Sequence, residues 1–258
     1  MPVPCLSRSI SNNTNMDRVA LITGGVRGIG RAAAVALARQ GWSIAANYRN
    51  SESEAATLER ELRAEGARIA CLRADVSDPG AADELVRQVE AQFGRIDALI
   101  NCAGPYHRVH LLEESTEGWH AMFDNNLHPV FYLSRRAASG MIERKWGRIV
   151  NFSLANADQH VGQPYITAHY IAKTGVLILT RTLAKILAPH GITVNSIAPG
   201  IIETGSVPLD EMSNMIKNIP AGYVGAPTDV ASGVCYLLSD EARYVNGANI
   251  HVSGAWGI

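Results

Sequence analysis

The chain has 258 residues, of which 47% are hydrophobic, and a formal net charge of −1 at pH 7. This composition supports a substantial apolar core, and the near-zero charge argues against nucleic acid or an acidic membrane surface as a partner. No apolar run approaches the ~18 residues that a membrane span requires. Residues 1–16 are polar and lack the apolar core of a secretory signal, so we expect them to form a disordered tail.

The cysteines, at positions 5, 71, 102 and 235, are scattered without the spacing of a metal site. Free thiols of this kind are typical of a reducing compartment, which predicts a cytoplasmic protein. His107 and His110 have the spacing i, i+3, but they lie in a segment predicted as a loop. We therefore expect no metal ion.

The stretch 18–41 has the pattern of a strand, a tight glycine turn and a helix. Apolar and β-branched residues at 19–22 predict a buried strand, and alanine-rich residues at 31–40 predict a helix. Between them lie glycines at 24, 25, 28 and 30. A diphosphate fits such a turn, because backbone N–H groups and the positive end of the helix dipole converge there and no Cβ blocks the approach. An ordinary βα turn is the alternative.

Strands and helices alternate through the rest of the chain with short connections. After the first strand and helix, strands are predicted at 43–48, 69–72, 96–101, 148–153, 193–197 and 248–252, and helices at 52–65, 81–93, 118–144, 168–187 and 229–238. Asn125 and Asn126 are expected to be buried in the long helix 118–144, and 210–225 is predicted to be a mobile helical lid. The alternation predicts one α/β domain over 17–258, with a doubly wound parallel sheet of Rossmann type.

The residues just past the second strand indicate which dinucleotide binds. An acidic residue at this place binds the ribose hydroxyls of NAD and repels a 2′-phosphate. Here the segment reads Asn47-Tyr48-Arg49-Asn50-Ser51, with no acid before Glu52. Arg27 in the glycine turn adds a second guanidinium, and two guanidiniums favour a phosphate. We therefore expect NADP(H), with a solvated loop charge as the alternative for Arg49.

Short motifs along the chain match those of one enzyme family in order. They are Thr23-Gly24-x-x-x-Gly28-Ile29-Gly30, Asp75-Val76, Asn101-Cys102-Ala103-Gly104, Trp119 with Asn126-Leu127, Gly147-Arg148-Ile149-Val150-Asn151, Gly191-Ile192-Thr193-Val194-Asn195 and Pro199-Gly200-Ile201-Ile202-Glu203-Thr204. The chain thus resembles the classical short-chain dehydrogenases/reductases, most closely the 3-oxoacyl-acyl-carrier-protein reductase type. The resemblance covers about residues 17–258. With the charges above, it implies a cofactor site formed by Gly24, Arg27, Gly28, Ile29, Gly30, Tyr48, Arg49, Asn50, Asp75, Val76, Asn101, Ala103, Gly104, Lys173, Pro199, Gly200, Ile202 and Thr204.

Two catalytic positions depart from the family pattern. The family reads G-R-I-V-N-I-S-S, and its last serine polarises the substrate oxygen. This chain reads G-R-I-V-N-F followed by Ser153 and Leu154, which places leucine at that position. The family's tyrosine, four residues before the lysine, falls on His169, with Tyr170 one place late. The segment from Leu154 to Lys173 is also longer than usual, so either the loop carries an insertion or Ser153 shifts into the catalytic position.

In the family, a hydride passes from the nicotinamide to a carbonyl carbon while the tyrosine protonates the oxygen. The resemblance implies that Lys173 holds the nicotinamide ribose and that Asn126 serves a water relay. The candidates for the proton donor are His169, Tyr170 and Tyr165. A cationic Lys173 should disfavour the imidazolium form of His169. Tyr165 is a candidate because the family's enoyl reductases space their tyrosine and lysine more widely, and wall packing is the alternative for both tyrosines.

The leading interpretation is an NADP(H)-dependent oxidoreductase that reduces a C=O, C=C or C=N bond of a small molecule, with Leu154 and His169 replacing the standard pair. Leucine donates no hydrogen bond to a developing alkoxide, and a C=N bond needs less of that stabilisation. The alternatives are a non-redox isomerase, dehydratase or cyclase that uses bound NADP as a scaffold, and a catalytically inactive binding subunit. The expected substrate pocket is lined by Pro105, Tyr106, Leu154, Ala155, His160 and Val207.

The segment 175–187 is apolar nearly all round, so we expect a helix that is covered on two sides. By the resemblance, this helix and the one that carries Asn126 pair across a two-fold axis. The resemblance therefore implies a homotetramer or a homodimer.

Overall fold

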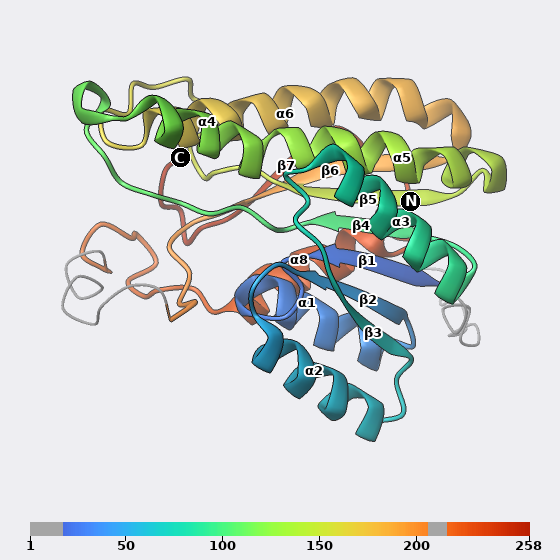
Figure 1. Ribbon diagram of the computed structural model, residues 1–258. Coiled ribbons are helices and arrows are strands. Elements are labelled where there is room, and N and C mark those ends of the chain that lie inside the picture. Colours follow the sequence, from blue (N-terminus) through green and yellow to red (C-terminus); the bar gives the residue numbers. More distant parts are fainter. Residues whose placement is uncertain (1–17, 206–215) are drawn as a thin grey trace, which may run out of the picture.

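One sheet of seven parallel strands forms the centre of the computed structural model, which describes residues 18–205 and 216–258 (Figure 1). The strands are β1 (Val19–Thr23), β2 (Ser43–Tyr48), β3 (Ile69–Arg73), β4 (Ala98–Asn101), β5 (Gly147–Phe152), β6 (Ile192–Pro199) and β7 (Asn249–Val252). Every residue of β1, β4 and β5 is buried. Strands that are buried along their whole length are typical of a parallel sheet that is covered on both faces.

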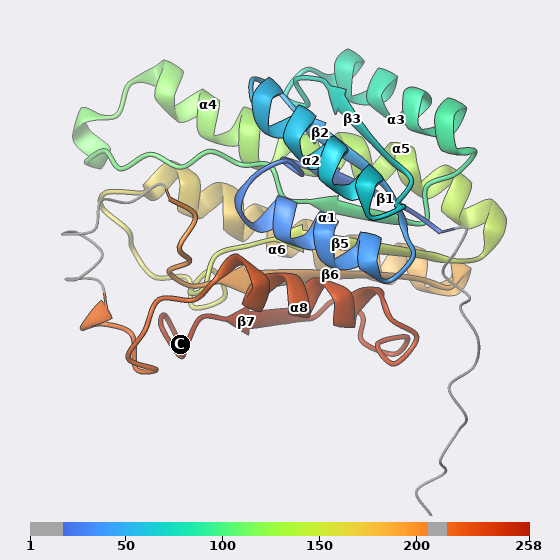
Figure 2. The ribbon, with the colours of Figure 1, turned by 90° about the horizontal axis from the view of Figure 1, so that it is seen from below.

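Helices cover the two faces of the sheet (Figure 2). They are α1 (Gly28–Arg39), α2 (Glu52–Ala64), α3 (Pro79–Phe93), α4 (Thr116–Asn126), α5 (His128–Arg144), α6 (Thr167–Leu187) and α8 (Pro227–Leu238), with short 3-10 turns at Leu111–Glu113 and Ala188–His190. One core cluster joins α1, α2 and α8 to the sheet, and a second joins α3, α5 and α6 to its other face. The protein is therefore a three-layer α/β sandwich.

The strand order is β3-β2-β1-β4-β5-β6-β7, and all neighbours pair in parallel. The order reverses between β1 and β4. In doubly wound sheets a ligand binds at such a switch point, outside the carboxyl ends of the strands. The predicted Rossmann fold is confirmed, and this edge of the sheet is where the site has to be sought.

The helix predicted over 118–144 is two helices. α4 ends at Asn126, Leu127 separates the two, and α5 begins at His128. The break has a local cause, because Pro129 in the first turn of α5 has no N–H to donate to the carbonyl four residues earlier. As a result Asn126 is buried at the end of a helix, whereas Asn125 is only half-buried.

The predicted lid at 210–225 lies partly outside the described residues, as do the predicted tail at 1–16 and Val207 of the expected pocket. Within the described part, residues 217–225 form turns rather than a helix. The backbone amide of Ala221 donates to the Gly254 carbonyl at 3.0 Å, and that of Gly225 donates to the Ile201 carbonyl at 3.0 Å. Pro220 lacks an N–H for a helical hydrogen bond. Among the helices that the structure describes, none is long and apolar enough to cross a membrane.

Candidate active site

The turn between β1 and α1 forms a cradle of bare backbone. Gly24 and Gly28 have φ angles of +61° and +53°, which glycine adopts without strain. A Cβ on Gly30 would collide with the Gly24 carbonyl oxygen, so any other residue would push the helix away from the strand. α1 begins at Gly28, inside the turn, and its N-cap Arg27 makes no side-chain capping hydrogen bond. The first amides of the helix therefore suit a diphosphate.

Two further segments border this cradle. The Ala103 amide at the end of β4 donates to Thr23 Oγ1 at 3.0 Å. On the other side, the methyl group of Thr204 lies 3.5 Å from the place where a Cβ of Gly28 would stand. The predicted cofactor segments after β1, β4 and β6 thus converge at the switch point of the sheet.

The segment after β6 is held close to β7. The Gly200 amide donates to the Val252 carbonyl at 3.0 Å, and a Cβ on Gly200 would come within 2.6 Å of Ser253 Cα. Ile202 forms an isolated parallel bridge with Gly225. These contacts hold in place the segment that contains Pro199, Gly200 and Ile202. Thr204 follows in the same segment and approaches the glycine turn.

Arg49 at the end of β2 is held by two side chains, and one of them, Asp75, belongs to the predicted cofactor site. Its guanidinium donates to Asn125 Oδ1 at 3.0 Å and lies 3.5 Å from the Asp75 carboxylate. Burial alone would raise the pKa of Asp75, but hydrogen bonds from Ser77 and the charge of Arg49 lower it overall. Arg27 is exposed in the glycine turn. No motif in the sequence signalled Asn125, which reaches Arg49 only because α4 folds back over this edge.

The side chain of Asn101 lies within the core rather than toward the cradle. Its Nδ2 donates to Asn151 Oδ1 at 2.8 Å and to Ser134 Oγ at 3.3 Å, and Asn151 donates to Thr180 Oγ1 at 2.9 Å. This buried series of hydrogen bonds links β4 and β5 to α5 and α6. Ala103 and Gly104 are left to form the more exposed surface beside the cradle.

Lys173 and Asn126 meet beside Gly104. The Lys173 ammonium donates to the Phe152 carbonyl at 3.1 Å, and Asn126 Nδ2 donates to the Pro105 carbonyl at 3.0 Å. A Cβ on Gly104 would come within 2.5 Å of Asn126 Oδ1 and 3.2 Å of Lys173 Nζ. Burial lowers the pKa of Lys173 from 10.5 to about 8. Asn126 Oδ1 is buried without a hydrogen-bond partner among the described residues, and such an atom calls for a polar group from outside the chain.

His169 is buried one helical turn before Lys173, as its spacing predicts. Its ring meets the Tyr106 ring edge-on, with the centroids 5.4 Å apart. Burial, and to a lesser extent the charges of Lys173 and His107, lower the pKa of His169 to about 3, although a hydrogen bond with the Pro105 backbone acts against them. The imidazole is therefore neutral at pH 7, and within the described structure its Nδ1 is buried without a partner.

The serine and leucine after β5 point in different directions. Ser153 is buried, and its hydroxyl donates to Asn249 Oδ1 at 2.7 Å, at the start of β7. The expectation that Ser153 shifts into the catalytic position is wrong in this structure, because side chains alternate between the two sides of the chain and this one is committed to β7. Leu154 is half-buried and supplies no hydrogen bond.

Neither tyrosine stands where the family places its proton donor. The Tyr170 hydroxyl donates to the Asn156 carbonyl at 2.7 Å and accepts from the Val161 amide at 3.1 Å, both in the loop after β5. Tyr165 is 47% exposed and lies between His110 and Arg108. These contacts agree with the wall-packing alternative for both residues.

The expected pocket is brought together only in part. Pro105 and Tyr106 are exposed, and Tyr106 reaches the His169 ring. Ala155 is fully buried, so it does not line the pocket. Gly257 covers it, because a Cβ built on this glycine would lie 3.2 Å from the Ala155 Cβ. His160 is exposed, with a φ angle of +55°.

Cys102 is a site residue whose role the sequence analysis missed. Burial raises the pKa of its thiol to about 12, and the Lys173 charge acts against this rise. The thiol is therefore protonated beside the lysine at neutral pH. The one available signal was its replacement of the second asparagine in the family's N-N-A-G motif.

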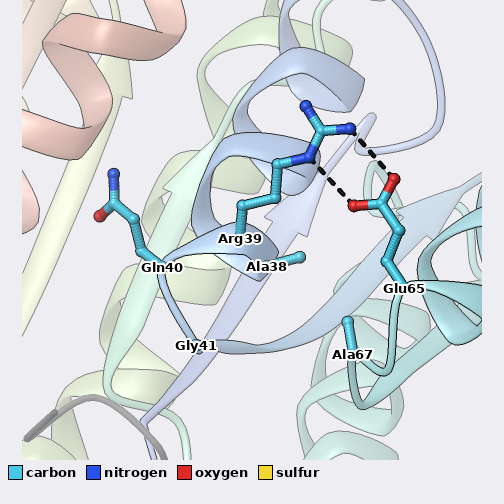
Figure 3. A pocket seen from close by; sticks show the side chains of 6 residues that line it. All are labelled: Ala38, Arg39, Gln40, Gly41, Glu65 and Ala67. Atoms are coloured by element: carbon cyan, nitrogen blue, oxygen red, sulfur yellow. Dashed lines mark hydrogen bonds and ion pairs between the residues drawn. The ribbon is translucent and has the colours of Figure 1, made fainter.

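A separate hollow at the other end of α1 has no part in this site (Figure 3). It is lined by Ala38, Arg39, Gln40, Gly41, Glu65 and Ala67. Arg39 Nε and Nη2 each lie 3.0 Å from an oxygen of Glu65, so the two charged groups satisfy each other. The hollow also lies away from the carboxyl ends of the strands.

A doubly wound sheet with a glycine cradle at its switch point defines a dinucleotide-binding Rossmann protein. Comparison with known proteins gives the family. Residues 24–256 match the family model described as enoyl-(acyl carrier protein) reductase. The chain belongs to the short-chain dehydrogenase/reductase family of NAD(P)-dependent oxidoreductases.

Its relatives include reductases of acyl thioesters. The chain is 37% identical to the 3-oxoacyl-[acyl-carrier-protein] reductase of Staphylococcus epidermidis over 244 residues, which cover 93% of this chain and 98% of the relative. The acetoacetyl-CoA reductase of Allochromatium vinosum matches with the same identity and coverage. A blue fluorescent protein from a metagenomic library, solved in complex with NADPH, superposes with a TM-score of 0.89 at 32% identity, covering 96% of this chain and 100% of that one.

Proposed function

We propose that the protein is an NADPH-dependent reductase of a small molecule whose active site lacks the family's serine and tyrosine. The observation that carries this proposal is Lys173, buried beside Gly104 and Asn126, with the buried His169 one helical turn before it. The glycine cradle and the unpartnered Asn126 oxygen fit a bound dinucleotide. NADPH in a related structure and the guanidiniums of Arg27 and Arg49 support NADP(H) over NAD(H).

When bound, the nicotinamide supplies a hydride to the substrate. Lys173 holds the ribose, and its pKa of about 8 makes it the group with a proton to give near neutrality. His169 is neutral at pH 7, so it orients the substrate through a hydrogen bond instead of acting as an imidazolium acid. Asn126 orients water between the lysine and the solvent.

Among the three possible bonds, the site favours C=N. Leu154 donates no hydrogen bond to an alkoxide, and the described site holds no phenol at the position of the missing tyrosine. A protonated imine carries its own proton, so hydride addition gives a neutral amine without a donor for an oxyanion. Ketones and enoyl groups remain substrates of the same site at lower rates.

The test follows NADPH absorbance with a β-keto ester, an enoyl thioester and a cyclic imine, with Lys173→Met as the inactive control. NADPH consumption matched by reduced product supports the proposal, and the fastest rate is expected with the imine. Substrate conversion at constant NADPH would instead establish a non-redox enzyme. Cofactor binding without conversion of the three compounds would favour an inactive binding subunit.

We also propose a homotetramer or homodimer built on α6. Ile171, Ile178 and Ile186 on this helix are 43%, 59% and 60% exposed, and Phe131 on α5 is 44% exposed. Large apolar side chains that recur along one helix are typical of an interface. The sequence predicts that α6 is covered on two sides, and these isoleucines lie on the part of the helix that one copy of the chain leaves exposed.

A further inference from the structure

Two loops at the mouth of the site pair with each other. The loop after β4 and the loop after β5 follow neighbouring strands at the edge where the cofactor segments converge (Figure 1). The Val109 amide donates to the Tyr165 carbonyl at 2.9 Å, and the Leu111 amide donates to the Pro164 carbonyl at 2.8 Å. These bonds fix residues 106–111 against the loop that leads into α6.

Alternate residues of this segment make contacts of different kinds. The Tyr106 ring meets His169, and the Arg108 guanidinium carbon lies 5.0 Å from the centre of the Tyr165 ring. His107 instead pairs with the Glu114 carboxylate at 2.7 Å. Tyr106 and Arg108 therefore both reach side chains of the stretch 165–169, which leads into α6 and carries His169.

Arg108 is exposed, and within the described parts of the chain its guanidinium has no carboxylate partner. The acid Glu114 of the same loop is already paired with His107. Stacking on a tyrosine ring holds the guanidinium plane in place and leaves its edge of N–H donors open. Such an edge matches the oxygens of a carboxylate or a phosphate with two parallel hydrogen bonds.

We propose that Arg108 binds an oxyanion group of the substrate, either a carboxylate or a phosphate, while the reducible carbon lies beside His169 and Lys173. This inference rests on the proposed reductase function and adds the chemical class of the substrate. The Cα atoms of Tyr106 and Arg108 are at most ~7 Å apart along the chain. The oxyanion therefore lies several bonds from the reducible carbon, and Arg108 determines specificity without taking part in the chemistry.

The test compares Arg108→Gln with the matched control Arg135→Gln. Arg135 is also exposed and also stacks on an aromatic ring, 5.7 Å from the centre of Phe131, but it lies on α5 away from the mouth of the site. One pair of probes is 6-oxoheptanoate and its methyl ester, which differ in a carboxylate. The other pair is 5-oxohexyl phosphate and 6-hydroxyhexan-2-one, which differ in a phosphate.

We expect Arg108→Gln to raise KM about ten- to a hundredfold for the charged member of one pair, the range of a charge-assisted hydrogen bond. The kcat of Arg108→Gln and its KM for the neutral member should change little. Arg135→Gln should leave kcat and KM nearly unchanged for both members. The pair that responds identifies the oxyanion as carboxylate or phosphate. If Arg108→Gln changes KM equally for the charged and the neutral member, or if the wild-type protein has the same KM for both, the proposal is wrong.

A binding measurement separates this proposal from the reductase function. Calorimetric titration of the same probes in the presence of NADP⁺ measures affinity while no reduction proceeds. If no probe consumes NADPH but the charged probe binds about tenfold or more weakly to Arg108→Gln, the reductase proposal fails and the oxyanion site stands. If Arg108→Gln lowers only the thermal stability, the guanidinium serves the loop alone and the oxyanion site is refuted.

Discussion

The neutral state of His169 should be visible in how stability depends on pH. An unfolded histidine has a pKa of roughly 6.5, whereas burial lowers that of His169 to about 3 in the folded protein. Between these values the unfolded chain binds one more proton at this position, so the native state loses stability as the pH falls from 6.5 toward 3. The loss is about 1.4 kcal/mol for each pH unit, or roughly 3 kcal/mol at pH 4.

His169→Phe removes this titration while keeping an aromatic ring against Tyr106. Its free energy of unfolding should therefore rise relative to the wild type by about 1.4 kcal/mol for each pH unit below 6.5. Urea denaturation at pH 7, 6, 5 and 4, at one protein concentration, measures the difference. The control is His120→Phe, which makes the same replacement at an exposed histidine.

Parallel pH curves for the wild type and His169→Phe would refute the reasoning, because they would mean that His169 titrates alike in the folded and unfolded states.

The same pKa has a kinetic consequence. The ring stays neutral down to about pH 3, so kcat/KM should show no acid limb from His169 between pH 5 and 7. A limb near pH 6.5 that disappears in His169→Phe would instead identify an imidazolium proton donor.

Other predictions follow from the same structure. Replacing Arg27 and Arg49 together with alanine should weaken NADPH binding by several-fold to a hundredfold and leave NADH nearly unchanged, as measured by fluorescence titration. Because burial lowers the pKa of Lys173 to about 8, kcat/KM should fall above about pH 8, where the ammonium loses its proton, and a profile that stays flat to pH 10 would contradict the role of this group. Ile178→Glu should reduce the mass found by light scattering at micromolar protein, and a wild-type monomer would argue against the α6 interface. Tyr170→Phe should lower stability by about 1–3 kcal/mol in urea denaturation, because it removes two hydrogen bonds to a partly buried loop, while turnover survives.

The sheet and the cofactor segments could be predicted from the sequence because their signals are local. β1 and β5 are mostly apolar and are buried along their whole length, and strands of this kind have to be covered on both faces. The positive φ angles of Gly24 and Gly28 demand glycine whatever surrounds the turn. These positions fix the order of strand, turn and helix, and the fold follows from repeating that unit.

The rest depends on contacts between distant parts of the chain. The pairing of Ser153 with Asn249 joins β5 to β7, and no spacing in the sequence indicates it. The bond between Arg49 and Asn125 likewise requires α4 to lie beside the end of β2. The sequence did predict that Lys173 would disfavour the imidazolium form of His169, but the larger cause is burial, which depends on the whole fold.

The register of α6 decides which residue stands beside Lys173, and Tyr170 helps to hold that register. Residues i and i+4 share a helix face, whereas the next residue lies about 100° away. Because α6 begins at Thr167, well before the lysine, no late start turns Tyr170 toward the site. Its hydroxyl instead binds the backbone of Asn156 and Val161, so a shift of one residue would break two partly buried hydrogen bonds. The loop and the histidine therefore belong together, because the tyrosine that fastens the loop to α6 holds the register in which His169 lies one turn before Lys173.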